Sequence, residues 1–302
     1  MAQAGPVQHH FHSQRLRLAY WEWGSADAPP LLLLHGKRDH ARSLDRLAVA
    51  FRGDYRVIAP DLRGHGDSDW AVGGYYGMSE HIADLLALID VVGEPVDIVG
   101  HSFGSRIALY AAGAFPERVH SVVAIEATVN FAFRGLSRRP LSEPEALRRW
   151  IARHEGYAEM QPRVYKTFDE ARERIQLVDS HLDDAWALEL ARHALRPVEG
   201  GYIWKFDPFA RGRTSDEIDV ETVRGFWAAV ECPVLHLLGG ASTWSTTPPA
   251  PEDKAAFRDA RWVIVPEAGH WLHHDAPDVA IRETRAFLAR HGRAGGGEDG
   301  AG

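Results

Sequence analysis

The sequence predicts an α/β protein with a mostly parallel central sheet flanked by helices, and three observations support this fold class. Short apolar runs alternate with amphipathic helical patterns up to residue 126 and again over residues 214–291. A glycine-flanked turn joins a strand pattern directly to a helical pattern within residues 96–110. Over residues 127–213 the alternation stops, which predicts a single inserted and mostly helical segment.

Composition excludes several other classes of protein. The chain has 302 residues, 45% of them hydrophobic, which is enough to bury a large core. A formal net charge of −8 without a basic block argues against a nucleic-acid partner. The single cysteine, Cys232, excludes an internal disulfide and is typical of a reducing compartment. We find neither a signal peptide nor a run long enough to span a membrane, and therefore expect a cytoplasmic protein.

The two core regions contain the elements that a parallel sheet needs. Residues 9–23 alternate in the manner of antiparallel edge strands. Residues 31–34 are wholly apolar, as expected for a strand that is buried on both faces. Further strands are predicted over residues 55–59, 96–99, 119–125, 234–238 and 262–265. Further helices are predicted over residues 43–52, 79–92, 218–229, 253–258 and 277–290.

The glycine-flanked turn is Gly100-His101-Ser102-Phe103-Gly104, a G-x-S-x-G pattern between a strand and a helix. Glycines flank Ser102 because so tight a turn leaves no room for side chains at those positions. The turn should present the Ser102 hydroxyl in a cleft, beside the free N–H groups of a helix N-terminus. This arrangement is typical of a nucleophilic serine.

A serine hydroxyl is a weak nucleophile near neutral pH and needs an adjacent base. Among 17 histidines, His270 fits this role, because it lies in a glycine-containing loop just after the last predicted strand. Loops at the carboxyl ends of parallel strands gather at one edge of the sheet, which is the edge that carries Ser102. His273 and His274 lie in the next helical turn and are expected to point away.

A third residue, a carboxylate, is needed to orient the histidine. Glu126 follows the strand predicted over residues 119–125 and is the only acid between Val119 and Ser137. We therefore predict that Glu126 fixes the tautomer of His270 and stabilises its protonated form. The alternative is a strand-end glutamate that only caps the next segment.

Two backbone N–H groups are candidates for an oxyanion hole. The N–H of Phe103 directly follows the nucleophile, and the N–H of Lys37 follows His35-Gly36 at the end of an apolar strand. The Lys37 side chain is not needed for this role and is expected to face solvent.

The inserted segment, residues 127–213, is predicted to cap this edge of the sheet. A capping box at Ser142 and Glu145 starts one helix, and further helical runs cover residues 168–178 and 182–195. A substrate pocket is expected between the cap and the sheet, and residues 292–302 are predicted to be disordered. The predicted apolar lining of that pocket is Phe131, Trp204, Trp244 and Trp271.

Four motifs together resemble the α/β-hydrolase superfamily over nearly the whole chain. They are the HG of His35-Gly36, DLRGHGDS from Asp61, GHSFGS around Ser102 and AGHWLHHDAP around His270. In the second motif we expect Asp61 and Arg63 to tie the loop together rather than to catalyse. In this superfamily the acid usually follows the seventh strand, where this chain has no acid before Glu252, too far along to reach the histidine. An acid after the sixth strand resembles haloalkane dehalogenases and some lactonases, but the dehalogenases have an aspartate nucleophile where this chain has serine.

These residues predict a serine hydrolase with no cofactor and no metal site. It would cleave a small carboxylic ester, thioester or lactone with an apolar part, through an acyl-enzyme. Hydrolysis of a carbon–carbon bond in a diketone is the nearest enzymatic alternative. An alternative from another class is a receptor on the same fold, which binds a small ligand without turnover. The sequence does not predict the oligomeric state.

Overall fold

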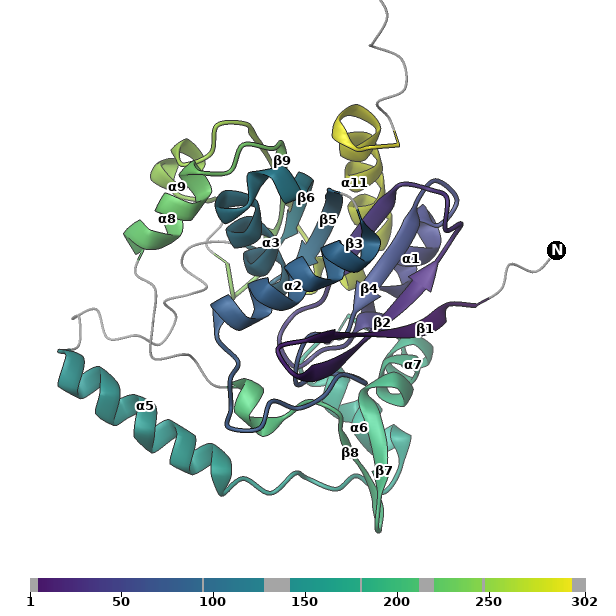
Figure 1. The fold of residues 1–302 in the computed structure, drawn as a ribbon. Helices are drawn as coiled ribbons and strands as arrows, with labels where there is room; N and C mark the ends of the chain where they lie inside the picture. The colour runs from purple at the N-terminus through teal and green to yellow at the C-terminus, as the bar shows by residue number, and fades with distance from the viewer. Residues whose placement is uncertain are drawn as a thin grey trace, which may run out of the picture.

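The computed structural model describes residues 5–93, 95–127, 142–179, 181–211, 220–245 and 248–294. In this part of the chain, an eight-stranded sheet has the strand order β1-β2-β4-β3-β5-β6-β9-β10 (Figure 1). The six strands from β4 to β10 in this order run parallel, whereas β2 pairs antiparallel with both β1 and β4. The predicted fold class, a mostly parallel sheet flanked by helices, is confirmed.

The observed elements agree with the predicted ones to within a few residues. The strands of the central sheet are β1 (Val7–Ser13), β2 (Leu16–Trp23), β3 (Pro30–Leu34), β4 (Arg56–Pro60), β5 (Val96–His101), β6 (Val119–Ile125), β9 (Val234–Gly239) and β10 (Ala260–Val265). The helices around it are α1 (Asp45–Phe51), α2 (Met78–Val92), α3 (Phe103–Ala114), α8 (Val220–Ala228), α9 (Pro251–Ala255), α10 (Leu272–Asp275) and α11 (Pro277–His291). Short 3-10 turns are η1 (Ala41–Leu44) and η2 (Pro116–Arg118).

Strand β3 shows why its sequence is wholly apolar. Leu32 and Leu34 belong to the core cluster formed with α2, α3 and α8 on one face of the sheet. Leu31 and Leu33 belong to the cluster formed with α1 and α11 on the other face. Because helices cover both faces of the sheet, no position of this strand meets solvent (Figure 1).

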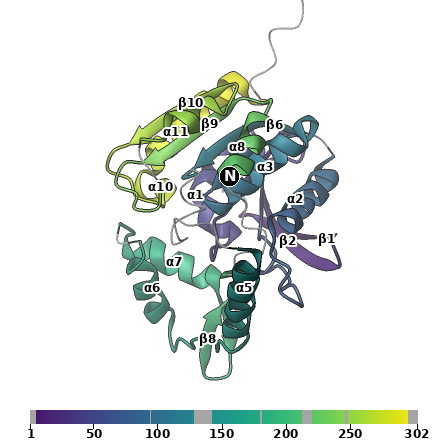
Figure 2. The same ribbon diagram turned by 90° about the vertical axis from the view of Figure 1, so that its left-hand side faces the viewer.

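Between β6 and α8 the chain leaves the central sheet. This stretch contains α5 (Glu143–Ala158), α6 (Phe168–Gln176), α7 (Asp184–Ala194), η3 (Pro208–Arg211) and a separate hairpin of β7 (Leu195–Val198) and β8 (Gly201–Trp204). We call its described residues, 142–179 and 181–211, the cap segment; its helices and hairpin lie together on one side of the sheet (Figure 2). The helices were predicted but the hairpin was not. Its turn contains Gly200 with a φ of +79°, a conformation for which glycine is the usual residue in hairpin turns.

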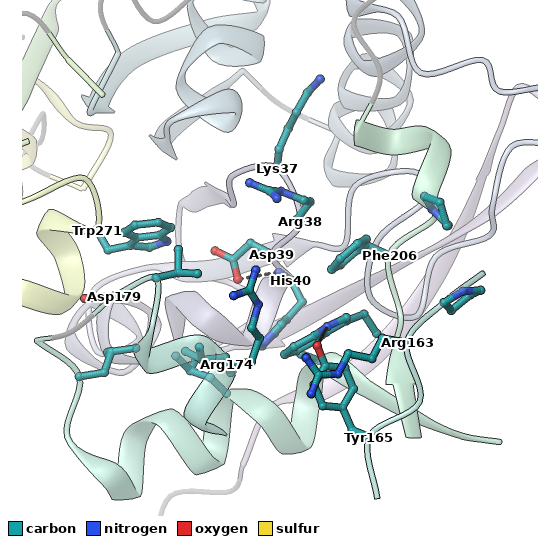
Figure 3. Close-up of a pocket in the computed structure, with 18 of the residues that line it drawn as sticks. Lys37, Arg38, Asp39, His40, Arg163, Tyr165, Arg174, Asp179, Phe206 and Trp271 are labelled. Carbon is teal, nitrogen blue, oxygen red and sulfur yellow. Dashed lines mark hydrogen bonds between the residues drawn. The ribbon is translucent and has the colours of Figure 1, made fainter. Parts of the chain in front are cut away.

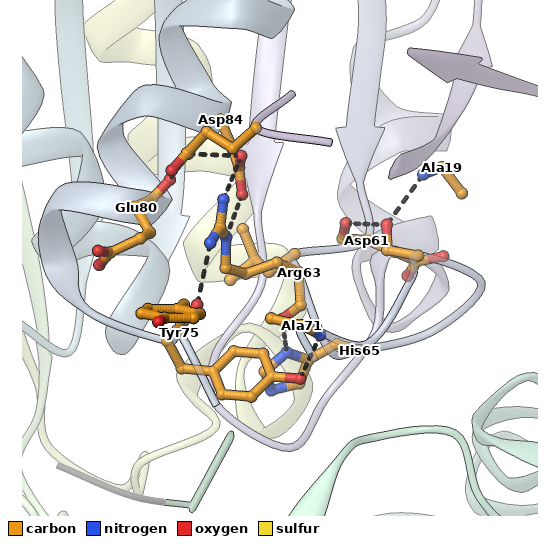
Figure 4. Close-up of polar contacts among 12 residues, drawn as sticks. Ala19, Asp61, Arg63, His65, Ala71, Tyr75, Glu80 and Asp84 are labelled. Carbon is orange, nitrogen blue, oxygen red and sulfur yellow. Dashed lines mark hydrogen bonds and ion pairs between the residues drawn. The ribbon is translucent and has the colours of Figure 1, made fainter. Parts of the chain in front are cut away.

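The loop after β4 is tied together by two charged side chains (Figure 4). Arg63 donates to both oxygens of Asp84 at 2.6 and 2.7 Å, and it is 2% exposed. Asp61 accepts the N–H groups of Ala41 and Asp67 at 2.8 and 3.0 Å. Burial raises the pKa of Asp61 to about 6. These contacts tie the loop to α2 and to η1, which fits the structural role expected for this motif.

Two further expectations concern membranes and the chain end. In the described ranges, no helix combines the length and the apolar character needed to cross a membrane. Of the tail predicted to be disordered, residues 292–294 are described, and the Arg293 N–H donates to Asp97 Oδ2 at 2.8 Å. Residues 295–302 lie outside the described part of the chain.

Candidate active site

Ser102 lies in a strained turn between β5 and α3. Its φ is +52° and its ψ is −108°, a backbone conformation that a residue with a side chain rarely adopts. A Cβ atom on Gly100 would lie 2.5 Å from Ser105 N, and one on Gly104 would lie 2.3 Å from Leu34 O. Both flanking glycines are therefore required by the close approach of neighbouring backbone.

The structure brings together the three side chains that were predicted as a triad. His270 follows β10, and its Nε2 lies 3.1 Å from Ser102 Oγ. On the other side of the ring, Nδ1 lies 3.0 Å from Glu126 Oε2. All three residues are buried, with exposed fractions of 4% for Ser102, 8% for His270 and 0% for Glu126. This geometry permits proton transfer from the serine hydroxyl to the imidazole while the carboxylate holds the opposite nitrogen.

The carboxylate of Glu126 is held by the loop that follows β9. Its Oε1 accepts the N–H of Gly239 at 2.6 Å. Its Oε2 accepts the hydroxyls of Ser242 and Ser245, each at 2.7 Å. The role of these two serines was not predicted from the sequence. The one indication in the sequence was the run of small polar residues after Leu238, where the acid of the triad usually lies in this superfamily. The loop after β9, which is the seventh strand of the central sheet in chain order, thus contributes hydroxyls that orient the carboxylate of Glu126 at the end of β6.

Three further histidines, His101, His273 and His274, lie around the triad. His101 Nε2 lies 2.9 Å from the backbone oxygen of His270 and so helps to fix the loop that carries it. Burial holds the pKa of His101 well below its ordinary value, so this ring stays neutral. The ring of His273 lies 4.5 Å from that of His101, and His274 Nε2 lies 3.1 Å from Ser43 O.

Both candidate oxyanion groups come from segments that adjoin Ser102. Phe103 is the first residue of α3, and the first N–H groups of a helix have no partner within the helix itself. The loop that carries Lys37 passes close by, since a Cβ atom on Gly36 would lie 3.5 Å from Ser102 Cβ. The Lys37 side chain does not simply face solvent as expected, because its Nζ lies 4.7 Å from the centre of the Phe103 ring.

A cavity of about 610 Å³ lies between the cap segment and the loop after β3 (Figure 3). Of the predicted lining residues, Trp204 and Trp271 line it, and Phe131 lies outside the described residues. Ser102 does not line the cavity itself. The cavity adjoins the triad through Lys37 and Trp271, which neighbour Gly36 and His270 in the chain.

Trp244, predicted to line the pocket, lies instead over the candidate base. Its ring centre is 5.5 Å from that of His270, and the residue is 38% exposed. Ser102 itself is only 4% exposed, so its side chain is largely enclosed. Within the residues that the structure describes, no group of three or more His, Cys, Asp or Glu side chains could hold a metal ion.

Comparisons with known proteins place the chain in a family. The model of the alpha/beta hydrolase family matches residues 31–283. A 3-hydroxybutyrate-oligomer hydrolase of Cupriavidus necator is 30% identical, over 84% of this chain and 87% of its own. An sn-1-specific diacylglycerol lipase of Mus musculus is 29% identical, over 88% and 83%. The solved thioesterase domain from the curacin biosynthetic pathway, 20% identical, shares the fold with a TM-score of 0.82 over 94% of this chain and all of that one. The chain belongs to the alpha/beta hydrolase family.

Proposed function

We propose that this hydrolase cleaves a carboxylic ester, thioester or lactone through a covalent acyl-enzyme on Ser102. The observation that carries the proposal is the continuous contact from Ser102 Oγ to His270 Nε2 at 3.1 Å and from His270 Nδ1 to Glu126 Oε2 at 3.0 Å. A nucleophile in contact with a base, and a base oriented by a carboxylate, is the arrangement that acyl transfer requires.

The reaction then has two halves. Ser102 Oγ attacks the substrate carbonyl while His270 Nε2 takes the hydroxyl proton, and the resulting oxyanion is bound by the N–H groups of Phe103 and Lys37. When the carbonyl re-forms, the bond to the leaving alcohol, thiol or lactone oxygen breaks, and His270 returns the proton to that atom. Water, deprotonated by His270, attacks the acyl-enzyme and releases the acid, and the proton returns to Ser102. Glu126 stabilises the protonated imidazole in both halves.

The substrate class is supported by the residues and by the names of relatives. A serine nucleophile forms acyl-enzymes with esters and thioesters, and oligomers of 3-hydroxybutyrate and diacylglycerols, which two of the relatives are named for, contain ester bonds. The aromatic lining by Trp204 and Trp271 fits a substrate with an apolar part. Cleavage of a diketone remains the enzymatic alternative, because the same three residues can serve it.

The test is a panel of p-nitrophenyl esters, acyl thioesters, lactones and diketones, with Ser102→Ala as the blank. We expect steady turnover of at least one ester, thioester or lactone, and a loss in kcat of roughly 10³-fold or more in the variant. A fluorophosphonate should form one adduct, at Ser102, as located by mass spectrometry of peptides. Equal turnover by the variant, or a label at another residue, would contradict the mechanism; binding of a ligand without turnover would favour the receptor alternative.

A further inference from the structure

The cavity between the cap segment and the core carries positive charge at its surface. The core loop contributes Lys37 and Arg38 to the lining, and the cap segment contributes Arg163 and Arg174. In Figure 3, Lys37 lies at one end of the group of lining residues, and Arg163 lies at the other end. Arg38, Arg163 and Arg174 are all exposed, so their guanidinium groups are accessible to a ligand.

Two acids also line the cavity, but their oxygens are largely withdrawn from it. Asp39 Oδ1 accepts the N–H of His40 at 2.9 Å, and its Oδ2 has almost no accessible surface. Burial raises the pKa of Asp39, which reduces its negative charge at a given pH. Asp179 is 5% exposed, and its Oδ2 is buried and lies 3.5 Å from His274 Nδ1. The charge that a ligand can reach is therefore mainly positive.

The two arginines of the cap segment lack carboxylate partners in the part of the chain that the structure describes. Arg172, on the same helix as Arg174, forms ion pairs with Asp169 and Asp184 at 3.2 and 2.7 Å. Neither Arg163 nor Arg174 forms such a pair within the described ranges. The guanidinium carbon of Arg163 instead lies over the Tyr165 ring, 4.9 Å from its centre, a contact that uses the face of the guanidinium group and leaves its N–H donors at the edge for another group.

The wall of the same cavity is partly aromatic. Trp271 lies next to His270 in the chain, and Phe206 and Tyr165 continue the lining (Figure 3). Trp204 also lines the cavity. The ring of Trp204 packs edge-on against Tyr165 and stacks on Phe206, so these three side chains form one aromatic group. A ligand in this cavity can therefore contact both aromatic surface and the guanidinium groups of the cap segment.

We propose that the substrate of this hydrolase carries an anionic group, which Arg163 and Arg174 bind from the cap side of the cavity. The group is a carboxylate or a phosphate, because planar guanidinium donors match the paired oxygens of both. An apolar chain then connects it to the carbonyl that Ser102 attacks. The reaction in this inference rests on the proposed function, whereas the binding of the anion is inferred only from the residues that line the cavity.

The experiment compares three p-nitrophenyl esters with acyl chains of equal length, which end in a methyl, a carboxylate or a phosphonate group. We expect kcat/KM for one or both anionic esters to exceed that for the neutral ester at least about tenfold, equivalent to about 1.4 kcal/mol. The anionic ester with the higher kcat/KM shows whether the substrate carries a carboxylate or a phosphate. The double variant Arg163→Gln, Arg174→Gln should remove the preference and leave the neutral ester within threefold. Arg192→Gln removes an exposed charge of the cap segment outside the cavity and should change neither value.

A preference for the neutral ester, or a preference that survives in the double variant, would overturn the proposal. A second readout does not depend on turnover. In Ser102→Ala, the intrinsic tryptophan fluorescence, to which Trp204 and Trp271 of the cavity contribute, should change saturably with a dicarboxylate or a phosphonocarboxylate of matching length. This response should disappear in the triple variant Ser102→Ala, Arg163→Gln, Arg174→Gln. If no ester is hydrolysed but the response occurs, the proposed reaction fails and the anion site stands. If esters are hydrolysed without a charge preference and the response is absent, the anion site fails alone.

Discussion

Replacement of Glu126 by glutamine tests the candidate triad sharply, because the structure determines which way the new amide must turn. Oε1 accepts a backbone N–H from Gly239, and a backbone donor cannot reorient. The amide oxygen must therefore take that place, and the amide NH₂ must take the place of Oε2. The hydroxyls of Ser242 and Ser245 can rotate to accept from it. His270 can accept from it only as the tautomer with its proton on Nε2.

That tautomer cannot take a proton from Ser102, since Nε2 is the atom that faces the serine hydroxyl. The variant also loses the negative charge that stabilises the protonated imidazole. The equivalent amide substitution in a Ser-His-Asp triad lowers kcat by about 10⁴ through the wrong tautomer. We expect kcat/KM for an ester to fall about 10²- to 10⁴-fold here, which corresponds to about 2.7–5.4 kcal/mol of transition-state stabilisation.

The assay is ester hydrolysis between pH 6 and pH 9, together with thermal unfolding to verify that the variant is folded. Glu252→Gln is the matched control, because Glu252 is exposed and should leave kcat/KM within about threefold of the wild-type value. The double variant Ser242→Ala, Ser245→Ala keeps the carboxylate and should cost less than about tenfold. A folded Glu126→Gln variant that retains more than a third of the wild-type kcat/KM would refute the assignment of the acid.

Three further predictions concern stability and reactivity. Gly104→Ala should lower the free energy of unfolding, measured in urea, by about 1–3 kcal/mol or more, because its Cβ would lie 2.3 Å from Leu34 O. Gly225→Ala in α8 should raise the free energy of unfolding by about 0.5–1 kcal/mol, because a Cβ there meets nothing within 4 Å. Burial lowers the pKa of His236 to about 3, so between about pH 6.5 and 3 the unfolded chain binds a proton that the folded chain does not. From pH 7.5 to 5.0, the free energy of unfolding in urea should therefore fall by about 2 kcal/mol less in His236→Leu than in the wild type. Burial raises the pKa of Cys232 to about 12, and iodoacetamide at pH 8 should therefore alkylate it in urea and not in buffer, as measured by intact mass.

The fold and the strand-end residues could be predicted because they follow from local rules. A strand that is buried on both faces must be apolar along its whole length, and β3 was recognised by that property. A strand that turns into a helix within one residue needs glycines, and this placed Ser102. Parallel strands bring their carboxyl ends to one edge, so Glu126 and His270 were expected near Ser102 although each is distant from it in the sequence.

The remaining features depend on contacts that no local pattern records. The β7–β8 hairpin is held against the cap helices by packing of Tyr165 and Leu195 in a small separate core. Ser242 and Ser245 acquire their role only because the loop after β9 turns back toward β6. Trp244 was assigned to the pocket by its apolar character, but the backbone of the same loop directs it onto His270. The direction of a side chain from a loop is set by tertiary contacts, which periodicity cannot reveal.

The sheet itself explains why an acid after β6 can reach the same imidazole as an acid after β9. Ser102 and Glu126 follow neighbouring strands and both have positive φ, +52° and +58°. The backbone N–H of Ser102 donates to Ile125 O and that of Glu126 donates to Leu237 O, each at 2.8 Å, so the sheet holds both strained residues in place. Because β6 pairs with β9, the Glu126 carboxylate lies 2.6 Å from the N–H of Gly239, the residue that ends β9. The two strand ends are thus adjacent positions around one imidazole, and a glutamate on the first, with serines after the second, provides the same contact to His270 Nδ1.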